Sequence, residues 1–330
     1  MIRARVIGTG SYLPDRVVTN EDIASTLNLT PDHIQRLTGI KERRWAADRE
    51  APSDMAIEAG RRALSAAGCQ ASAVEAIILS TTSPDTVFPS TACYVQRGLG
   101  CQGVGAFDVS ASCSGFLYGL SMGQAMIQSG QLKTCLVAAS EVKSRSLDPQ
   151  DQETAMLFGD GAGAVILRGE DDHNPDWRGI LGIRLRADGS RHGLIRVQAG
   201  GSRTPSTQAT LEKQEHTIRM QGAALYRVAI RRIEQAMQEL LKEFGVGIGE
   251  ITQVVLHQAN GRILHQVADR LGIPPNKLMS VIERYGNTSS ASLPIALDTA
   301  VRGGAIAAGD LVLLGSFGGG VTWATGLVRW

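Results

Sequence analysis

The sequence predicts an α/β fold made of two duplicated halves. Apolar strand-type runs alternate with helix-type runs that end at glycine, an arrangement typical of a largely parallel sheet. The same order of elements then recurs later in the chain. A separation of 32 residues between Thr81 and Cys113 is close to the 30 residues between His257 and Asn287. We interpret this recurrence as an internal duplication.

In the first half, strands are expected at 74–83, 105–112, 135–140 and 159–169, because each is a short apolar run bounded by turn residues. Helices are expected at 91–100 and 114–130. Both show apolar residues at helical spacing, and both end at a glycine.

The second half repeats this order. The strand and polar loop at 252–260 correspond to the first predicted strand, and 287–304 corresponds to the small polar turn and helix that follow Cys113. Strands at 309–320 and 320–330 complete the repeat. We therefore divide the chain into a first half at 1–170, a connecting and loop-forming region at 171–216, and a second half at 217–330. The second half begins with an amphipathic helix at about 217–244.

Composition and charge narrow the class of protein. The chain has 330 residues, of which 43% are hydrophobic and 20% charged, and its net charge of +1 favours neither nucleic acid nor an acidic membrane surface as a partner. Its apolar runs are far too short to cross a bilayer. The five cysteines include no CxxC pair, which leaves neither a disulfide framework nor zinc-ligand spacing. We expect a soluble cytoplasmic protein without a bound metal.

Three residues stand where strands end and helices begin. Cys113 follows a strand and precedes a helix among small residues, so its sulfur is as well explained by packing as by nucleophilic chemistry. The simpler interpretation of His257 is a histidine that caps a loop, and the simpler interpretation of Asn287 is a turn residue. Because the carboxyl ends of parallel strands share one edge, these residues can converge. The glycine-rich 316–322 lacks a phosphate-loop lysine, but its N–H groups could stabilise an oxyanion.

Eight segments together carry a resemblance that covers nearly the whole chain. They are GTGSYLP (8–14), LTGIKER (37–43), TTSPDTVFPSTAC (81–93), DVSASCSGF (108–116), FGDGAGA (158–164), HQANGRI (257–263), YGNTSSAS (285–292) and FGGGVTW (317–323). In this order and spacing the chain resembles the β-ketoacyl-acyl carrier protein synthase III family of condensing enzymes. The resemblance implies a thiolase-like fold with a layered α-β-α-β-α core.

The resemblance also implies an acyltransferase. In its reaction an acyl thioester acylates Cys113, and a decarboxylating Claisen condensation with malonyl-acyl carrier protein gives a β-ketoacyl product that starts an acyl chain. It implies a homodimer that uses acyl-CoA and acyl carrier protein, with no metal or redox cofactor. The residues that the resemblance assigns are Cys113, His257 and Asn287 for catalysis; Cys113 and Gly319 for the oxyanion hole; Phe88 (from the partner subunit) and Phe317 for the acyl pocket; His33 and Asn260 for coenzyme A and its pantetheine arm; and Arg227 and Arg262 for carrier-protein docking.

The sequence departs from the family pattern at positions that bind coenzyme A. His33 and Leu37 stand where a tryptophan and an arginine are usual, Gln152 replaces an arginine, and Ala223 replaces an asparagine. Lys143 stands where an apolar pocket residue is frequent. An alternative is therefore a condensing enzyme or acyltransferase of specialised metabolism with a non-acetyl donor. An inactive partner subunit is a third possibility, against which the intact Cys-His-Asn set argues.

Overall fold

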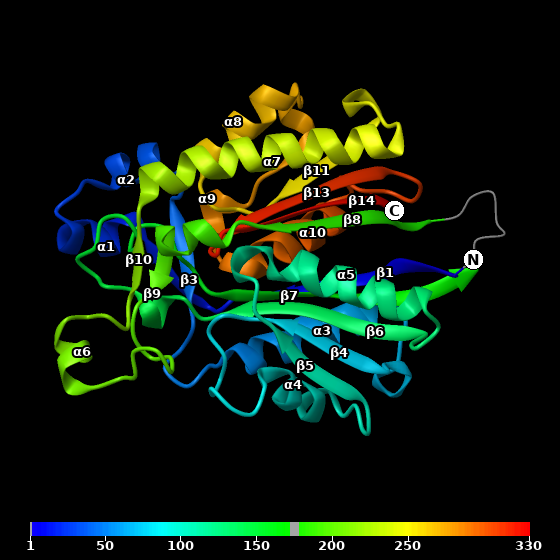
Figure 1. The fold of residues 1–330 in the computed structure, drawn as a ribbon, viewed down its shortest axis with the longest axis horizontal. Coiled ribbons are helices and arrows are strands. Elements are labelled where there is room, and N and C mark those ends of the chain that lie inside the picture. The colour runs from blue at the N-terminus through cyan, green and yellow to red at the C-terminus, as the bar shows by residue number, and fades with distance from the viewer. Residues whose placement is uncertain (1, 172–177) are drawn as a thin grey trace.

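Two five-stranded sheets form the framework of the chain, in a computed structural model that describes residues 2–171 and 178–330 (Figure 1). The first sheet has the order β1-β7-β6-β4-β5, and the second has the order β12-β11-β13-β14-β8. The first sheet contains β1 (Ile2–Tyr12), β4 (Ala76–Ser80), β5 (Gly105–Val109), β6 (Thr134–Glu141) and β7 (Gly161–Asp171). The second contains β8 (Gly179–Ala187), β11 (Gln253–Leu256), β12 (Leu278–Met279), β13 (Leu311–Gly318) and β14 (Thr322–Arg329).

The two sheets have matching topology, as expected of a duplication. In each, three parallel strands (β5-β4-β6 and β12-β11-β13) are followed by two antiparallel ones (β7-β1 and β14-β8). The predicted strands at 74–83, 105–112, 135–140 and 159–169 are β4, β5, β6 and β7. Their predicted counterparts in the second half are β11, β13 and β14. The predicted duplication is confirmed by this correspondence.

Helices complete the five layers α-β-α-β-α, with α5 and α10 in the middle between the sheets (Figure 1). The middle layer is α5 (Gly115–Gln128) and α10 (Ser292–Arg302). The outer layers are α3 (Pro52–Ala66) and α4 (Thr91–Leu99) on the first sheet, and α7 (Gly222–Phe244) and α8 (Gly261–Leu271) on the second. The predicted helices at 91–100, 114–130 and 287–304 correspond to α4, α5 and α10. The helix expected at 217–244 begins at Gly222, after a short strand.

Smaller elements surround this framework. They are β2 (Arg16–Thr19), α1 (Asn20–Leu27), α2 (Pro31–Thr38), β3 (Glu42–Trp45), β9 (Ile195–Val197), α6 (Gln208–Glu212), β10 (Ile218–Met220) and α9 (Ile282–Tyr285). The 3₁₀ turns are η1 (Ala71–Ala73), η2 (Ser112–Ser114), η3 (Ser144–Ser146), η4 (Gly189–Leu194), η5 (Ile248–Glu250), η6 (Pro275–Lys277) and η7 (Ser289–Ala291). The turns η2 and η7 precede α5 and α10, the two helices of the middle layer.

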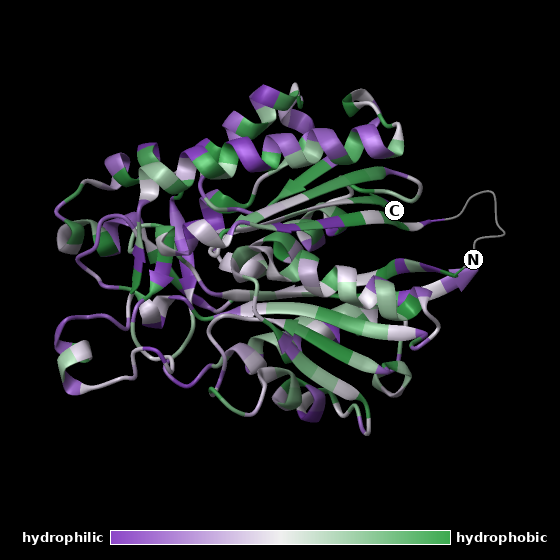
Figure 2. Cartoon of the chain, viewed as in Figure 1, coloured by the Kyte–Doolittle hydropathy of each residue, from purple (hydrophilic) through white to green (hydrophobic). Residues whose placement is uncertain are grey.

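The strands of both sheets are apolar on both faces, because helices cover each face. In β6, Cys135 and Val137 pack in the core between the sheets, while Leu136 and Ala138 pack against the outer helices. Strand β13 repeats this alternation with Val312 inside and Leu313 outside. Figure 2 shows the strands as mainly hydrophobic, whereas α7 has a polar outer face.

One strand of the second sheet differs from the sequence expectation. The predicted connecting region 171–216 contributes β8, which pairs with β14 and completes the second sheet; residues 172–177 of that region lie outside the described residues. Strand β8 corresponds to β1 of the first sheet. Its Ile180 and Ile183 enter the core, whereas Arg184 and Arg186 are less buried. Because apolar and charged residues are mixed in a region rich in Gly and Arg, the sequence shows no continuous apolar run here that would predict a strand.

The two glycines of the GTGS segment (8–11) have a packing role. Gly8 and Gly10 lie on the same face of β1, and α3 packs directly on them. A Cβ on Gly8 would collide with the Ala63 carbonyl oxygen, and one on Gly10 with that of Ala59. The missing side chains therefore let the helix backbone approach the strand.

We predict that Gly10→Ala lowers the free energy of unfolding by about 2 kcal/mol, because overpacking against a helix backbone cannot relax at low cost. Gly105→Ala is the matched control, since Gly105 also lies in a strand but an added Cβ there would meet nothing within 4 Å. Urea denaturation of both variants measures the difference. Equal stability of the two variants would contradict this account of the β1–α3 contact.

Candidate active site

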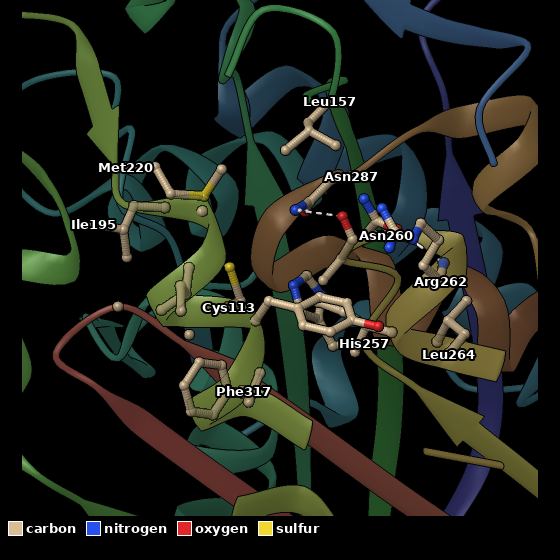
Figure 3. Close-up of a pocket in the computed structure, with 18 of the residues that line it drawn as sticks. Cys113, Leu157, Ile195, Met220, His257, Asn260, Arg262, Leu264, Asn287 and Phe317 are labelled. Atoms are coloured by element: carbon tan, nitrogen blue, oxygen red, sulfur yellow. Dashed lines mark hydrogen bonds between the residues drawn. The ribbon is translucent and has the colours of Figure 1, made fainter. Parts of the chain in front are cut away.

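A cavity of about 710 Å³ brings together residues from both halves (Figure 3). Cys113 reaches it from the start of α5, His257 from the end of β11, and Asn287 from the turn before η7. Most of the remaining lining is apolar. It includes Met156, Leu157, Phe158, Ile195, Met220, Leu225, Ala229, Ile233, Leu256, Ile263, Leu264, Val267 and Phe317.

Cys113 is the central residue of η2 and is only 8% exposed. The turn is tied to the other half of the chain, because Thr322 Oγ1 donates to the Ala111 carbonyl (2.9 Å) and Ser114 Oγ donates to the Thr322 carbonyl (3.0 Å). Burial raises the pKa of the Cys113 thiol, and a hydrogen bond with Ser289 acts in the opposite direction. Burial of the sulfur therefore opposes formation of a thiolate at this position.

His257 is buried, and its environment favours the neutral imidazole. Burial lowers its pKa to about 3, while the backbone of Ser289 acts in the opposite direction. Nδ1 lies 2.5 Å from Ser292 Oγ, which also accepts the Gln258 N–H (3.1 Å). The Ser292 hydroxyl keeps its own proton, which it can donate to Nδ1. We infer that the ring proton is on Nε2, so that the imidazole can donate a hydrogen bond within the site.

Asn287 is held by bonds to its side chain and its backbone. Nδ2 donates to the Ala259 carbonyl (3.3 Å), and Oδ1 accepts the Ser289 N–H (2.9 Å). An amide nitrogen carries two protons, so one remains for a ligand in the cavity. The backbone of Asn287 bridges to Phe158: its N–H donates to the Leu157 carbonyl (2.9 Å), and its carbonyl accepts the Gly159 N–H (3.0 Å).

Gly319, the second predicted oxyanion donor, also lines the cavity. Its N–H donates to Ser112 Oγ at 3.0 Å, and that hydroxyl lies 4.0 Å from the Cys113 sulfur. A thioester oxygen that used the Gly319 N–H would therefore have to replace the Ser112 hydroxyl. The oxyanion role of Cys113 and Gly319 stays a prediction.

Other predicted site residues divide into two groups. Phe317, Asn260, Arg227 and Arg262 all line the cavity, together with Leu37, Gln152 and Ala223, the three departures from the family pattern. Phe88 and His33 are not among the lining residues. Phe88 is 88% exposed on the loop between β4 and α4. His33 lies half-buried on α2, one turn before Leu37 and on the same side of that helix.

Hydrogen bonds occupy two of the predicted coenzyme A positions. Asn260 caps α8 by accepting the Arg262 N–H (2.8 Å), and its Nδ2 donates to the Leu37 carbonyl (3.2 Å). Gln152 Nε2 donates to the Leu27 carbonyl (2.6 Å). These bonds tie the cavity wall to α1 and α2, so the amides of Asn260 and Gln152 already serve the protein's own structure.

Sequence reasoning does not assign a role in the site to several residues that lie in or near it. Ser289 and Ser292 lie within the YGNTSSAS segment, next to Asn287, and this position is the signal that could have found them. Glu141 ends β6, where a buried carboxylate is unusual, and Lys143 follows it closely. Ile195 and Met220 come from the paired strands β9 and β10.

Within residues 2–171 and 178–330, no group of three or more His, Cys, Asp and Glu side chains is arranged to hold a metal ion. Over the same ranges, no helix combines the length and the apolar character needed to cross a membrane.

The layered duplicated fold and its Cys-His-Asn cavity define a condensing enzyme of the thiolase-fold class. Two family models match the chain: 3-oxoacyl-[acyl-carrier-protein] synthase III over residues 107–189, and the C-terminal part of the same family over 241–330. The chain belongs to the β-ketoacyl-[acyl-carrier-protein] synthase III family.

Individual relatives cover the full length. The β-ketoacyl-[acyl-carrier-protein] synthase III of Erythrobacter litoralis is 44% identical over 330 residues, which are 100% of both chains. The solved 3-oxoacyl-[acyl-carrier-protein] synthase III of Aquifex aeolicus is 41% identical with a TM-score of 0.90, covering 99% of this chain and 100% of that one. The priming β-ketosynthase of the R1128 polyketide pathway is 33% identical with a TM-score of 0.91, covering 99% and 96%.

We predict that His257 makes stability depend on pH between about 3 and 6.5. The unfolded chain binds a proton with the ordinary pKa of 6.5, whereas the folded protein binds it only near 3, so stability falls as the pH drops below 6.5. Between pH 7 and pH 5 this loss amounts to about 2 kcal/mol.

Urea denaturation at pH 7 and pH 5 measures this loss, which His257→Gln should remove. His265→Gln, at an exposed histidine of α8, is the control and should keep the wild-type dependence. The assignment fails if His257→Gln loses as much stability on acidification as the wild-type protein.

Proposed function

We propose that this protein catalyses a decarboxylating Claisen condensation between an acyl thioester and malonyl-acyl carrier protein. The product would be a β-ketoacyl carrier protein that initiates fatty-acid or related acyl-chain synthesis. The convergence of Cys113, His257 and Asn287 on one largely apolar cavity carries this proposal. The membership of the chain in the synthase III family supports the same reaction.

The first half-reaction is acyl transfer to Cys113. The sulfur attacks the thioester carbonyl, the carbonyl oxygen takes up negative charge, and the thiol of the donor leaves. The backbone N–H groups of Cys113 and Gly319 are proposed to stabilise that oxygen, with the Ser112 hydroxyl holding the Gly319 N–H beforehand. The buried setting makes such donors more effective than they would be in water.

The second half-reaction is decarboxylation followed by carbon–carbon bond formation. Loss of carbon dioxide from the malonyl thioester places negative charge on the thioester oxygen as an enolate. The His257 imidazole and the free proton of the Asn287 amide are two neutral donors that could stabilise it. The carbanion then attacks the acyl-cysteine carbonyl, and the Cys113 sulfur leaves. No step requires a metal or a redox cofactor.

Exposed apolar residues support a homodimer. Val87 and Phe88 are 95% and 88% exposed in the single chain, which is unusual for side chains of this size. A second copy that covers this loop would bury both residues. We propose that Phe88 contributes to the acyl pocket of the partner subunit, opposite Phe317.

Carrier-protein docking is supported by charge at the cavity. Arg227 and Arg262 both line it, and Arg262 stacks on the Tyr226 ring with its guanidinium carbon 5.8 Å from the ring centroid. Arginine side chains at this position suit an acidic carrier protein and the phosphate of its phosphopantetheine group.

Two kinds of acyl donor are candidates: acetyl-CoA, and a non-acetyl or carrier-protein-bound acyl group. Leu37, Gln152 and Ala223 line the cavity without adding a cation or an aromatic surface, so the usual grip on coenzyme A is weakened. This favours a non-acetyl group or a carrier-protein donor, as in specialised metabolism, over acetyl-CoA. The likeness to a priming β-ketosynthase supports keeping this second candidate. All five cysteines are free, which suits the proposed cytoplasmic location.

We predict that acyl-CoAs of increasing length, or the same acyl groups on carrier protein, add one acyl mass to the protein. Cys113→Ala should remove this addition completely, because no other sulfur lines the cavity as a nucleophile in the described chain. Intact-mass spectrometry measures the adduct, with Cys93→Ala as the control that retains it. A Cys113→Ala protein that still gained the acyl mass would refute the nucleophile.

We predict that His257→Ala and Asn287→Ala separate the two half-reactions. Each variant should still accept the acyl group on Cys113, yet decarboxylate malonyl carrier protein at least about 100-fold more slowly, since removal of one oxyanion donor costs that much. Acyl mass and carbon dioxide release are measured on the same samples. Normal condensation by either variant would rule out its enolate-stabilising role.

A further inference from the structure

A buried carboxylate lies close behind the nucleophile. Glu141, the last residue of β6, is completely buried, and both of its oxygens are occupied. Oε1 accepts from Ser289 Oγ (3.1 Å) and Ser290 Oγ (2.8 Å), whereas Oε2 accepts from Ser83 Oγ (2.7 Å). The carboxylate thus joins the first sheet, the loop after β4 and the turn η7 of the second half.

This carboxylate is linked to Cys113 through one hydroxyl. Ser289 Oγ lies 3.5 Å from the Cys113 sulfur and gives its own proton to Glu141. While Ser289 gives its proton to Glu141, its oxygen can accept the S–H proton of the thiol. If the hydroxyl turns its proton to the sulfur instead, it favours the thiolate, which is the direction in which this hydrogen bond acts on the pKa of Cys113. The negative charge of Glu141 also opposes a second negative charge on the sulfur. By itself, Glu141 would make the nucleophile harder to form.

Lys143 counters this charge. Its side chain is 9% exposed, its Nζ lies 3.0 Å from Glu141 Oε2, and it donates to Thr82 Oγ1 at 2.5 Å. It is not among the residues that line the cavity, so it does not take the part of an apolar acyl-pocket residue. Burial alone would raise the pKa of Glu141, but Lys143 and the hydrogen bonds lower it overall, so the pair is ionic.

The charged groups near the sulfur are few. Glu141 acts to raise the pKa of the Cys113 thiol, and Lys143 acts to lower it. The third titratable neighbour, His257, is neutral because burial lowers its pKa to about 3. Three more charged side chains, Glu153, Arg227 and Arg262, line the same cavity and remain unchanged in the experiments below.

We propose that Lys143 is a positioning residue for the nucleophile: by neutralising Glu141, it allows the Cys113 sulfur to ionise while Glu141 keeps Ser289 oriented. One consequence of this inference rests on the proposed function, namely that acyl transfer depends on Lys143. The ionisation itself can be measured without any acyl substrate.

Alkylation by iodoacetamide across a pH series measures that ionisation. The thiol proton passes to solvent, the sulfur forms a bond to the CH₂ carbon, and iodide leaves. Peptide mass spectrometry follows Cys113 and, as an internal control in every sample, the half-exposed Cys93. Lys143→Met should move the Cys113 profile upward by at least one pH unit, which slows its reaction at pH 7 about tenfold. The Cys93 profile should not move.

Two further variants separate charge from packing. Glu141→Gln leaves Lys143 unopposed and should move the Cys113 profile downward. The double variant Glu141→Gln/Lys143→Met has no charge at either position. It should return the profile to within about half a pH unit of wild type, because neither side chain is then a buried ion without a partner. Acyl transfer to Cys113 should fall in Lys143→Met and recover in the double variant.

The outcomes are decisive for each variant. An unmoved profile in Lys143→Met, or a double variant as slow as a folded Lys143→Met, would overturn the proposal. If Lys143→Met does not fold, the downward shift in Glu141→Gln and the near-wild-type profile of the double variant test the same claim. Loss of condensation with an unshifted alkylation profile would contradict the role of Lys143 but leave the proposed reaction intact.

Discussion

A two-bond backbone bridge between the halves is the constraint on which the site depends. The Asn287 N–H and carbonyl bond to Leu157 and Gly159, so a turn of the second half is joined to a loop of the first. The approach is close: a Cβ on Gly159 would lie 3.2 Å from the Arg43 Cβ, and one on Gly286 would lie 2.8 Å from the Leu157 carbonyl oxygen. Arg43 is completely buried behind this junction, where its guanidinium donates to the Met156 carbonyl (2.8 Å). The position of the amide therefore follows from the contact between the two halves.

The duplication explains why polar groups gather at this one place. The turns η2 and η7 are equivalent, each precedes a helix of the middle layer, and they contact each other between the sheets. Their first residues, Ser112 and Ser289, have φ values of +51° and +53°, which serine adopts only where its surroundings impose it. One turn carries the cysteine, and the other carries the serine that contacts its sulfur. The duplicated architecture thus supplies two strained turns, of which one bears the proposed nucleophile.

The buried centre of the fold could be predicted from the sequence more fully than its edges. Strands covered on both faces are continuous apolar runs, so β4, β6, β11 and β13 are visible locally, and so is their recurrence. The strands β1 and β8 are not, because packing glycines interrupt the first and arginines the second. In the site, the order of motifs identifies Cys113. The role of the Glu141–Lys143 pair depends instead on contacts with Thr82 and Ser289, which lie far away in the chain. No local pattern contains those contacts.

Burial has opposite effects on the two kinds of group in this cavity. It strengthens every hydrogen bond that can meet a developing negative charge, and it keeps His257 neutral, which suits the proposed role of a donor to an enolate. The same burial raises the pKa of the Cys113 thiol and so disfavours the nucleophile. A site that uses one cavity for both half-reactions cannot remove this conflict by opening to water. Hydrogen bonds from Ser289 and Ser112 reduce it, and so does a fixed positive charge outside the cavity wall but near the sulfur. Lys143, which is paired with Glu141 behind Ser289, occupies that position.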